Sequence, residues 1–326
     1  MKTVLVTGGA GYIGSHVSMK LSKEGVIPVC FDDLSTGNEW AIKWGPFVKG
    51  TISDIDLLRR TFRKYDISAV LHFAGSAYVG ESVSAPEKYY ENNVAGGLSL
   101  LTAMRLEGVN NLIFSSSCAT YGNPKSVLID ETTPQLPINP YGRTKLIFEN
   151  ILKDYFSSYS LNSMSLRYFN AAGADSSAEI GECHSPCPHL IPNLIKSFYR
   201  KGSPLVINGD DFETYDGTCI RDFIHVQDLA EAHFKALMDI LDRPQCSQLN
   251  LGTGRGYSIM ELLKITSDLL GMPANYLIGD RREGDPSALV ADPALAYEKL
   301  GWSPKNSIED ILRDAINWHA KEMDCV

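Results

Sequence analysis

Long apolar runs are missing from this sequence of 326 residues, and none of its segments reaches the roughly 20 apolar residues that a membrane-spanning helix needs. Cysteine is sparse as well: the chain has seven, an odd number without regular spacing, so we expect no disulfide framework. Basic residues are outnumbered, since 39 acidic residues face 30 lysines and arginines and the net charge is -9. This excess of negative charge argues against nonspecific binding of nucleic acid.

The composition that remains is ordinary for a globular protein, with 44% apolar and 21% charged residues. The length predicts two domains, or one domain with a large elaboration. A strand pattern begins within the first three residues, which leaves no room for a signal peptide. We therefore expect a cytoplasmic protein that makes no membrane contact.

A glycine-rich turn follows the first apolar stretch. The run Thr7-Gly8-Gly9-Ala10-Gly11-Tyr12-Ile13-Gly14 comes directly after Val4-Leu5-Val6. Glycines at this spacing allow a sharp strand-to-helix turn and let the backbone and a helix N-terminus approach a pyrophosphate. The next apolar stretch ends in Asp32, where an acid is expected to meet the adenosine ribose and to repel a 2′-phosphate. The pattern predicts a site for NAD.

Strand and helix patterns alternate through the first half of the chain. Short apolar stretches indicate buried strands at 2–7, 27–31, 69–73, 112–115 and 164–167, and helical periodicity separates them at 54–64, 86–107 and 140–159. We predict an α/β fold: a Rossmann-type doubly wound parallel sheet with a smaller α/β substrate domain. In such a sheet, ligands bind at the carboxyl ends of the strands.

The composition of the chain changes beyond about residue 170, where prolines, glycines and polar residues become frequent. Helical patterns continue at 191–200, 226–241, 259–270 and 308–321. We predict an NAD-binding domain over 1–170 and a substrate domain over 171–326. Segments around 222–252 are expected to return to the first domain, because Leu249-Asn250-Leu251 can extend its sheet.

Three polar residues carry the expected chemistry. Tyr141 and Lys145 are four apart after a proline suited to an early helical position, so both project from one helix face. A nearby ammonium and the positive charge of an oxidised nicotinamide favour the phenolate, and are expected to move the tyrosine pKa from about 10 toward neutrality. Tyr141 can then accept a hydroxyl proton, while Ser117 hydrogen-bonds the same oxygen. Each pattern alone is common, but their joint order indicates redox chemistry on an alcohol.

The chain resembles the extended short-chain dehydrogenase/reductase family over nearly its whole length. Besides the glycine-rich turn, the motifs that carry this resemblance are His72-Phe73-Ala74-Gly75, Val79-Gly80-Glu81-Ser82, Phe114-Ser115-Ser116-Ser117, Asn139-Pro140-Tyr141-Gly142, Leu166-Arg167-Tyr168-Phe169-Asn170, Asp216-Gly217-Thr218, Arg221-Asp222-Phe223-Ile224-His225-Val226 and Arg281-Arg282-Glu283-Gly284-Asp285.

The resemblance implies inversion at C4 of a UDP-hexose through a transient 4-keto sugar, with NAD retained and no net redox change. Ser117, Tyr141 and Lys145 are the implied catalytic residues. The implied cofactor-binding residues are Gly8, Gly11, Tyr12, Ile13, Gly14, Asp32, Asp33, Ile52, Phe73, Ala74, Gly75, Asn92, Ser115, Tyr141, Lys145 and Tyr168. The implied substrate-binding residues are Ser117, Asn170, His189, Leu190, Arg221, Arg282, Asp285 and Leu289. A homodimer is also implied, formed through the helices near 86–107 and 140–159.

The preferred sugar stays open. UDP-glucose and UDP-galactose are the first expectation, but Leu289 stands where some related enzymes carry a tyrosine, and the smaller side chain leaves volume for an N-acetyl group, as in UDP-GlcNAc and UDP-GalNAc. A 4-epimerase acting on UDP-xylose and UDP-arabinose shares almost every motif. A noncatalytic NAD-binding protein is a weaker alternative, because it has no need for the serine, tyrosine and lysine together.

One cluster falls outside the resemblance. Cys183-His184-Ser185-Pro186-Cys187-Pro188-His189 carries four side chains of the types that bind zinc, but it lacks the second paired knuckle of a zinc ribbon. We therefore expect a proline-rich surface loop and no metal.

Overall fold

The structure is a computed structural model that describes residues 2–184, 187–199, 204–282 and 285–323. Arg200 of the helix predicted over 191–200 lies outside the described residues, as do Ser185, Pro186, Glu283 and Gly284 of the motifs above.

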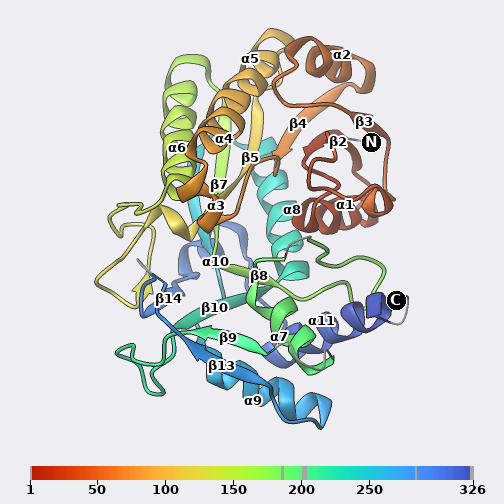
Figure 1. The fold of residues 1–326 in the computed structure, drawn as a ribbon. Helices are drawn as coiled ribbons and strands as arrows, with labels where there is room; N and C mark the ends of the chain where they lie inside the picture. Colours follow the sequence, from red (N-terminus) through yellow and green to blue (C-terminus); the bar gives the residue numbers. More distant parts are fainter. Residues whose placement is uncertain (1, 185–186, 200–203, 283–284, 324–326) are drawn as a thin grey trace.

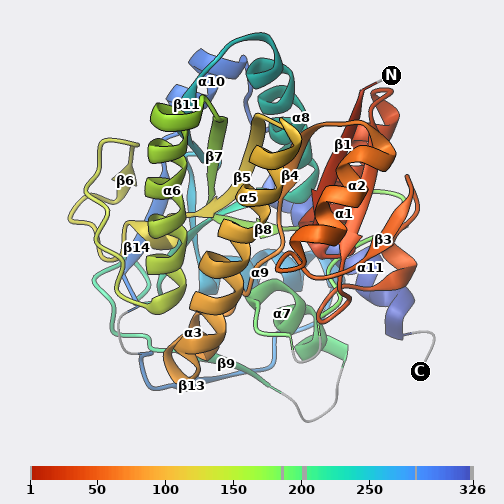
Figure 2. The ribbon, with the colours of Figure 1, turned by 90° about the horizontal axis from the view of Figure 1, so that it is seen from above.

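A seven-stranded parallel sheet forms the centre of the larger layer (Figures 1 and 2). Its strand order is β3-β2-β1-β4-β5-β7-β11, so the chain winds outward in both directions from β1, and the predicted doubly wound sheet is confirmed. The strands are β1 (Thr3–Thr7), β2 (Ile27–Asp32), β3 (Phe47–Lys49), β4 (Ile67–His72), β5 (Asn111–Ser117), β7 (Asn162–Tyr168) and β11 (Cys246–Leu251).

Helices cover both faces of this sheet, because side chains alternate along each strand. Val4 and Val6 point into one apolar core, which includes residues of α1 (Tyr12–Lys23) and α8 (Val226–Asp242). Leu5, between them, points into a second core with α2 (Ile55–Tyr65), α5 (Gly97–Glu107) and α6 (Pro140–Tyr159). A strand buried on both faces is apolar at every position, which explains why short unbroken apolar runs predicted these strands correctly.

The helix predicted over 86–107 is one rod with a change of winding inside it. It comprises α4 (Pro86–Tyr89), a π-helical segment (Tyr90–Gly96) and α5, and the short α3 (Val79–Ser84) precedes it. Hydrophobic periodicity cannot reveal a single wide turn, because apolar residues on either side keep helical spacing. The π segment matters for the site, since it carries Asn92 and Asn93.

A smaller layer lies below the carboxyl ends of the main strands in Figure 1. One sheet has the order β12-β10-β14-β6, with β8 also paired to β10, and a separate pair joins β9 to β13. These strands are β6 (Leu128–Ile129), β8 (Asn170–Ala172), β9 (Leu205–Asn208), β10 (Ile220–His225), β12 (Gly256–Ser258), β13 (Tyr276–Gly279) and β14 (Ala288–Ala291). Most have only two to four residues, too few to show a periodic pattern in the sequence.

Three helices close the apolar core of this smaller layer: α7 (Leu190–Tyr199), α9 (Ile259–Leu270) and α11 (Ile308–Met323). A fourth, α10 (Ala294–Leu300), packs against α8 and β11 of the larger layer. The segment from α8 to β11 belongs to the large sheet by its contacts, since β11 pairs with β7 and α8 packs on α1. The division into domains at about residue 170 stays a prediction. Among the described helices, none has the length and apolar character to cross a membrane.

Candidate active site

The glycine-rich turn between β1 and α1 has the shape that a dinucleotide site requires. Gly8 has a φ of +70°, and a Cβ there would lie 2.6 Å from the backbone nitrogen of Ala74. A Cβ at Gly14 would lie 2.2 Å from the carbonyl oxygen of Gly8, so only glycine lets α1 pack this close to the turn. Gly11 begins α1 without a side-chain cap, which leaves the helix N–H groups available to phosphate oxygens. The turn therefore fits a dinucleotide.

Asp32 stands at the carboxyl end of β2 and joins that strand to the turn. Its carboxylate accepts hydrogen bonds from the backbone N–H of Ala10 at 3.0 Å and of Leu34 at 2.8 Å. Burial raises the pKa of Asp32, whereas these bonds act in the opposite direction. The next residue, Asp33, accepts from the backbone of Ser35 and is exposed. The acid expected at the ribose thus lies beside the glycine-rich turn.

The three residues of the expected catalytic group meet where β5 ends against α6. Asn139 caps α6 by accepting the N–H of Gly142 at 2.8 Å, and Pro140 occupies the first turn, as the sequence predicted. Lys145 lies one turn after Tyr141 and donates from Nζ to the carbonyl oxygen of Ser115 at 2.7 Å. The Nζ atom is 5.7 Å from the centre of the Tyr141 ring.

Ser117 completes this group as the last residue of β5. Its side chain hydrogen-bonds Tyr141, and its Oγ also accepts from the N–H of Ala119 at 3.1 Å. Ser117 is 9% exposed and Lys145 is 6% exposed, so a hydroxyl bound between them would be shielded from bulk water. The structure thus brings the serine, tyrosine and lysine together as expected.

The expected lowering of the Tyr141 pKa depends on the charge of an oxidised nicotinamide as well as on Lys145, so it stays a prediction for the complex with NAD. Burial raises the pKa of Tyr141 to about 12, and the hydrogen bond from Ser117 only partly opposes this. Burial also lowers the pKa of Lys145 to about 8. The reason is that both groups are largely removed from water, where desolvation disfavours the charged form of each.

The loop after β4 faces the same place from the other side. Phe73 and Ala74 donate their N–H groups to the carbonyl oxygen of Thr7 at 2.9 and 3.0 Å, which ties this loop to β1. Asn92 donates to the hydroxyl of Ser76 at 3.2 Å. Gly75 would contact Asn93 if it carried a Cβ. Three of the predicted cofactor residues thus follow β4 directly, and the fourth, Asn92, comes from the π-helical turn.

Asn93, to which no sequence pattern pointed, joins two parts of the site. Its amide oxygen accepts from the backbone of Ser76 at 2.7 Å, and its nitrogen donates to the Ser76 carbonyl and to Thr144, both at 3.0 Å. The residue is buried and lies opposite α6, next to the lysine. No local pattern points to it, because its importance depends on the π-helical turn.

A second missed group is a buried ion pair beneath the catalytic residues. Arg167 of β7 and Glu149 of α6 form a bond of 2.7 Å, with side chains 2% and 0% exposed. The same carboxylate accepts from Ser116 at 2.5 Å, and the arginine donates to Tyr121 at 2.7 Å. This network connects β5, β7 and α6, so it holds the strand that carries Ser117 against the helix that carries Tyr141.

Other predicted cofactor residues line the same end of the sheet. Tyr12 donates to the carbonyl oxygen of Gly173 at 2.6 Å, and Ile13 packs against the core beside α1. Ile52 is buried against Gly96. Tyr168, the last residue of β7, is hydrogen-bonded to His233, and burial raises its pKa above the ordinary value. Their contacts with NAD stay a prediction.

The predicted substrate residues come mainly from the smaller layer. Arg221 of β10 forms an ion pair of 3.4 Å with Asp285, and it lies opposite Leu289 of β14 in the strand register. Asn170 of β8 donates to the backbone of Asp222 at 2.9 Å. Leu289 is 9% exposed and packs with Tyr121, Ile129, Phe169, Ala291 and Cys118. Because Cys118 follows Ser117, these residues border the catalytic group.

Two predicted substrate residues lie at the start of α7, and a third lies beside Asp285. His189 precedes that helix and bonds the buried carboxylate of Glu182, while Leu190 is its first residue. Arg282 is exposed, and its carbonyl oxygen accepts the N–H of Asp285 at 3.2 Å. The structure therefore groups Asn170, Arg221, Asp285 and Leu289, and it joins Arg282 to them through the backbone of Asp285.

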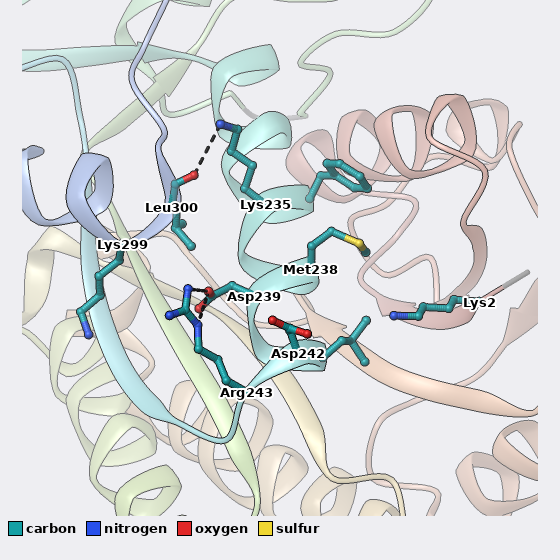
Figure 3. Close-up of a pocket in the computed structure, with 10 residues that line it drawn as sticks. Lys2, Lys235, Met238, Asp239, Asp242, Arg243, Lys299 and Leu300 are labelled. Atoms are coloured by element: carbon teal, nitrogen blue, oxygen red, sulfur yellow. Dashed lines mark hydrogen bonds and ion pairs between the residues drawn. The ribbon is translucent and has the colours of Figure 1, made fainter.

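A shallow pocket of about 510 Å³ lies elsewhere (Figure 3). It is lined by Lys2, the end of α8, Arg243, Lys299 and Leu300. Lys2 precedes β1, so this pocket borders the amino edge of the sheet, opposite the glycine-rich turn. Ligands of doubly wound sheets bind at the carboxyl edge, and the pocket is therefore not the candidate site.

The fold and the site together define a class: enzymes that bind a dinucleotide at the switch point of a parallel sheet and handle a hydroxyl proton beside it. The chain belongs to the NAD dependent epimerase/dehydratase family, whose model matches residues 4–252.

Its relatives are more specific. It is 48% identical to a UDP-glucose 4-epimerase of Rhizobium leguminosarum bv. trifolii over 98% of both chains. The structure matches a crystal structure of UDP-glucose 4-epimerase from Brucella ovis in complex with NAD, with a TM-score of 0.95, 51% identity and coverage of 97% of this chain and 98% of that chain. It also matches a UDP-glucose-4-epimerase from Stenotrophomonas maltophila with bound NAD and formylated UDP-arabinopyranose, with a TM-score of 0.97, 38% identity and full coverage of both chains.

Proposed function

We propose that this protein inverts the configuration at C4 of a UDP-hexose, interconverting UDP-glucose and UDP-galactose with NAD as a bound cofactor. The observation that carries the proposal is the meeting of Ser117, Tyr141 and Lys145 at the end of β5, next to the glycine-rich turn. The relatives that share 48% and 51% identity over nearly the whole chain are UDP-glucose 4-epimerases, which supports the same reaction here.

The chain's own residues handle the proton. NAD, when bound, supplies a hydride acceptor for C4 and a positive charge that favours the phenolate of Tyr141. Tyr141 accepts the proton of the 4′-hydroxyl as the C4–H bond breaks, and Ser117 donates a hydrogen bond to the oxygen that becomes a carbonyl. Lys145 stays close to the tyrosine, held by Ser115. Tyr141 then returns the proton to the sugar oxygen, and a hydride delivered to the opposite face of C4 would give the epimer without net oxidation.

The 4-keto sugar has to rotate within the site while the nucleotide to which it is linked stays bound. We assign the nucleotide end to Asn170, His189, Leu190, Arg221, Arg282 and Asp285, and the sugar end to Ser117 and Leu289. Arg221 is 12% exposed, and a partly desolvated guanidinium can bind a phosphate through two N–H groups. We therefore expect the diphosphate to be bound firmly and the sugar loosely, so that the sugar can rotate while the nucleotide stays in place.

The experiment uses the purified protein with UDP-galactose and no added NAD. We expect UDP-glucose to form, and Tyr141→Phe to lower kcat at least ~100-fold with bound NAD unchanged, because general acid–base catalysis contributes that much. Tyr159→Phe, at the exposed end of the same helix, is the matched control and should match the wild type. Equal activity of Tyr141→Phe and the control would contradict the assignment of Tyr141 as the group that accepts the proton.

The expected range of sugars depends on the side chain at position 289, which packs beside Cys118 and Phe169. A leucine there leaves more volume than a tyrosine, so we propose that UDP-GlcNAc is also epimerised. Leu289→Tyr should then reduce turnover of UDP-GlcNAc by more than tenfold relative to UDP-glucose. The reason is that a steric clash with the N-acetyl group costs roughly 1–3 kcal/mol. A panel that includes UDP-xylose tests the pentose alternative in the same assay, and an absence of UDP-GlcNAc turnover by the wild type contradicts the larger range.

We further propose a homodimer formed through α5, α6 and the π-helical segment. Leu98, Leu106 and Ile147 are 37%, 49% and 36% exposed on these helices, which is unusual for large apolar side chains unless a partner covers them. Light scattering at micromolar concentration should give twice the chain mass, and Leu98→Lys should shift it toward one chain. We keep the cytoplasmic location as part of the proposal; no disulfide joins the six cysteines that the structure describes.

A further inference from the structure

Four side chains that can bind a metal converge between β8 and α7. Glu182, His184, Cys187 and His189 each offer one ligand atom, and these four atoms lie within 4.8 Å of one another. The sequence led us to expect a surface loop without metal, because its cysteines and histidines lack a second paired knuckle. The fold adds a ligand that this pattern does not contain, the carboxylate of Glu182, which is 4% exposed.

The contacts around Glu182 are crowded for a set of hydrogen bonds. One carboxylate oxygen, Oε1, faces Nδ1 of His184 at 3.0 Å, Sγ of Cys187 at 3.5 Å and Nδ1 of His189. An ionised carboxylate offers about two lone-pair sites on each oxygen, so three donors exceed what one oxygen can accept well. A cation bound among the four atoms removes this conflict, because each atom then donates a lone pair to the metal and none has to donate a hydrogen bond.

The surrounding contacts hold this arrangement in place. Trp318 donates from its ring nitrogen to the carbonyl oxygen of Glu182 at 2.9 Å, and Asn193 donates to the carbonyl oxygens of Cys187 and His189, both at 2.9 Å. The ring of Tyr78 stands edge-on to both histidine rings. A preformed set of ligands of this kind loses little entropy when a metal binds.

We propose that Glu182, His184, Cys187 and His189 form a four-coordinate Zn²⁺ site. Thiolate, imidazole and carboxylate are the ligands that zinc uses, and in a tetrahedral site they lie roughly 3.3–3.8 Å apart. The most distant pair of the four atoms has to close by about 1 Å to reach that spacing, whereas the Glu182 oxygen has to move away from the two imidazole nitrogens. A site with four protein ligands has no open position for a substrate or water, so the zinc is structural.

The site has a consequence for substrate binding, and this step rests on the proposed function. A metal on Nδ1 of His189 leaves Nε2 protonated and fixes the direction in which it donates. His189 is the residue that we assign to the diphosphate, so the zinc orients one of its donors. Metal binding itself is independent of turnover and can be tested without it.

The test measures metal content and cobalt spectra of the full-length protein. After dialysis against metal-free buffer, we expect about one zinc per chain. Co²⁺ exchanged into the site should give the intense visible bands of four-coordinate cobalt and a near-ultraviolet band from sulfur-to-cobalt charge transfer. Cys187→Ser should lose the sulfur band and bind Co²⁺ at least ~10-fold more weakly. Cys183→Ser, in the same segment but outside the four ligands, is the matched control and should keep both.

Circular dichroism of each variant separates loss of the site from loss of the fold, and His184→Asn offers a second variant if Cys187→Ser does not fold. The proposal is overturned if the wild type retains less than about one tenth of an equivalent of zinc, if Co²⁺ binds without a sulfur band, or if Cys187→Ser and Cys183→Ser bind alike. Epimerase activity with those results would leave the proposed function intact.

Discussion

The two layers of the molecule place their functional residues in different ways. In the large sheet, Ser117, Tyr141 and Lys145 are held by regular elements, a capped helix and buried hydrogen bonds beneath them. In the smaller layer, Arg221, Asp285 and His189 come from short strands, a loop and the start of a helix, and they are more exposed. The expected reacting groups are fixed where an error of position is costly, whereas the groups assigned to the nucleotide lie nearer the surface, where a UDP-sugar can reach them.

The largest expected effect tests the rigidity of the large sheet at Gly14. A Cβ in Gly14→Ala would lie 2.2 Å from a backbone oxygen that cannot move aside, so we expect loss of retained NAD and a fall in unfolding free energy of more than about 2 kcal/mol. Gly80→Ala is the control, because a Cβ there meets nothing within 4 Å. Absorbance of nucleotide released on denaturation measures NAD, and normal retention by Gly14→Ala would contradict the close packing.

The buried ion pair should give an effect of similar size on stability, without the direct loss of NAD. Glu149→Gln leaves the cation of Arg167 buried without its partner, so we expect a loss of about 3–5 kcal/mol in urea unfolding. Arg243→Met breaks an ion pair whose arginine is 66% exposed and should cost less than about 1 kcal/mol. The double variant Glu149→Gln/Arg167→Met should recover part of the loss. Similar costs for the buried and exposed pairs would show that the network does not hold the site.

A change in the smaller layer should act on substrate binding instead. Arg221→Met removes the guanidinium assigned to the diphosphate, so we expect KM for UDP-galactose to rise about 10- to 100-fold, the value of a charged hydrogen bond, while kcat changes much less. Arg255→Met, whose guanidinium stacks on Tyr257 at 4.7 Å, is the control. An unchanged KM with a lowered kcat would reverse the division of roles between the layers.

The smallest effect concerns pH and a buried histidine of α1. Nδ1 of His16 is hydrogen-bonded to the carbonyl oxygen of Tyr12, and its Nε2 has no hydrogen-bond partner among the described residues. Burial lowers the pKa of His16 from 6.5 to about 4. The unfolded chain therefore binds the proton first, and stability contributed at pH 7 is lost as the pH falls from 6.5 toward 4. The full shift corresponds to about 3 kcal/mol as an upper bound.

Urea unfolding at pH 7 and pH 4.5 measures this effect. His16→Asn keeps a donor toward Tyr12 but has no group that titrates, so its stability should fall less between the two pH values than that of the wild type. Equal slopes for the two proteins would show that another group controls the acid sensitivity.

Much of the site was predictable because its signals are local. The turn at Gly8, Gly11 and Gly14 and the spacing of Tyr141 and Lys145 each follow from the geometry of one strand or one helix. The contribution of Asn93 was not predictable, since it depends on a π-helical turn that leaves no periodic signal. The same holds for Glu149 and Arg167, which read in the sequence as an ordinary charged residue of a helix and an ordinary polar residue of a strand.

The sequence by itself determined the α/β fold, the dinucleotide turn and the candidates for the reacting groups, because apolar periodicity, glycine spacing and helix geometry act over a few neighbouring residues. Only the tertiary structure decided how deeply Tyr141 and Lys145 are buried. Burial raises the pKa of Tyr141 and lowers the pKa of Lys145, so it favours the neutral form of both groups. It also decided that Glu182 joins His184, Cys187 and His189. Desolvation and the convergence of side chains depend on what packs around a residue, and that is set by segments far away in the chain.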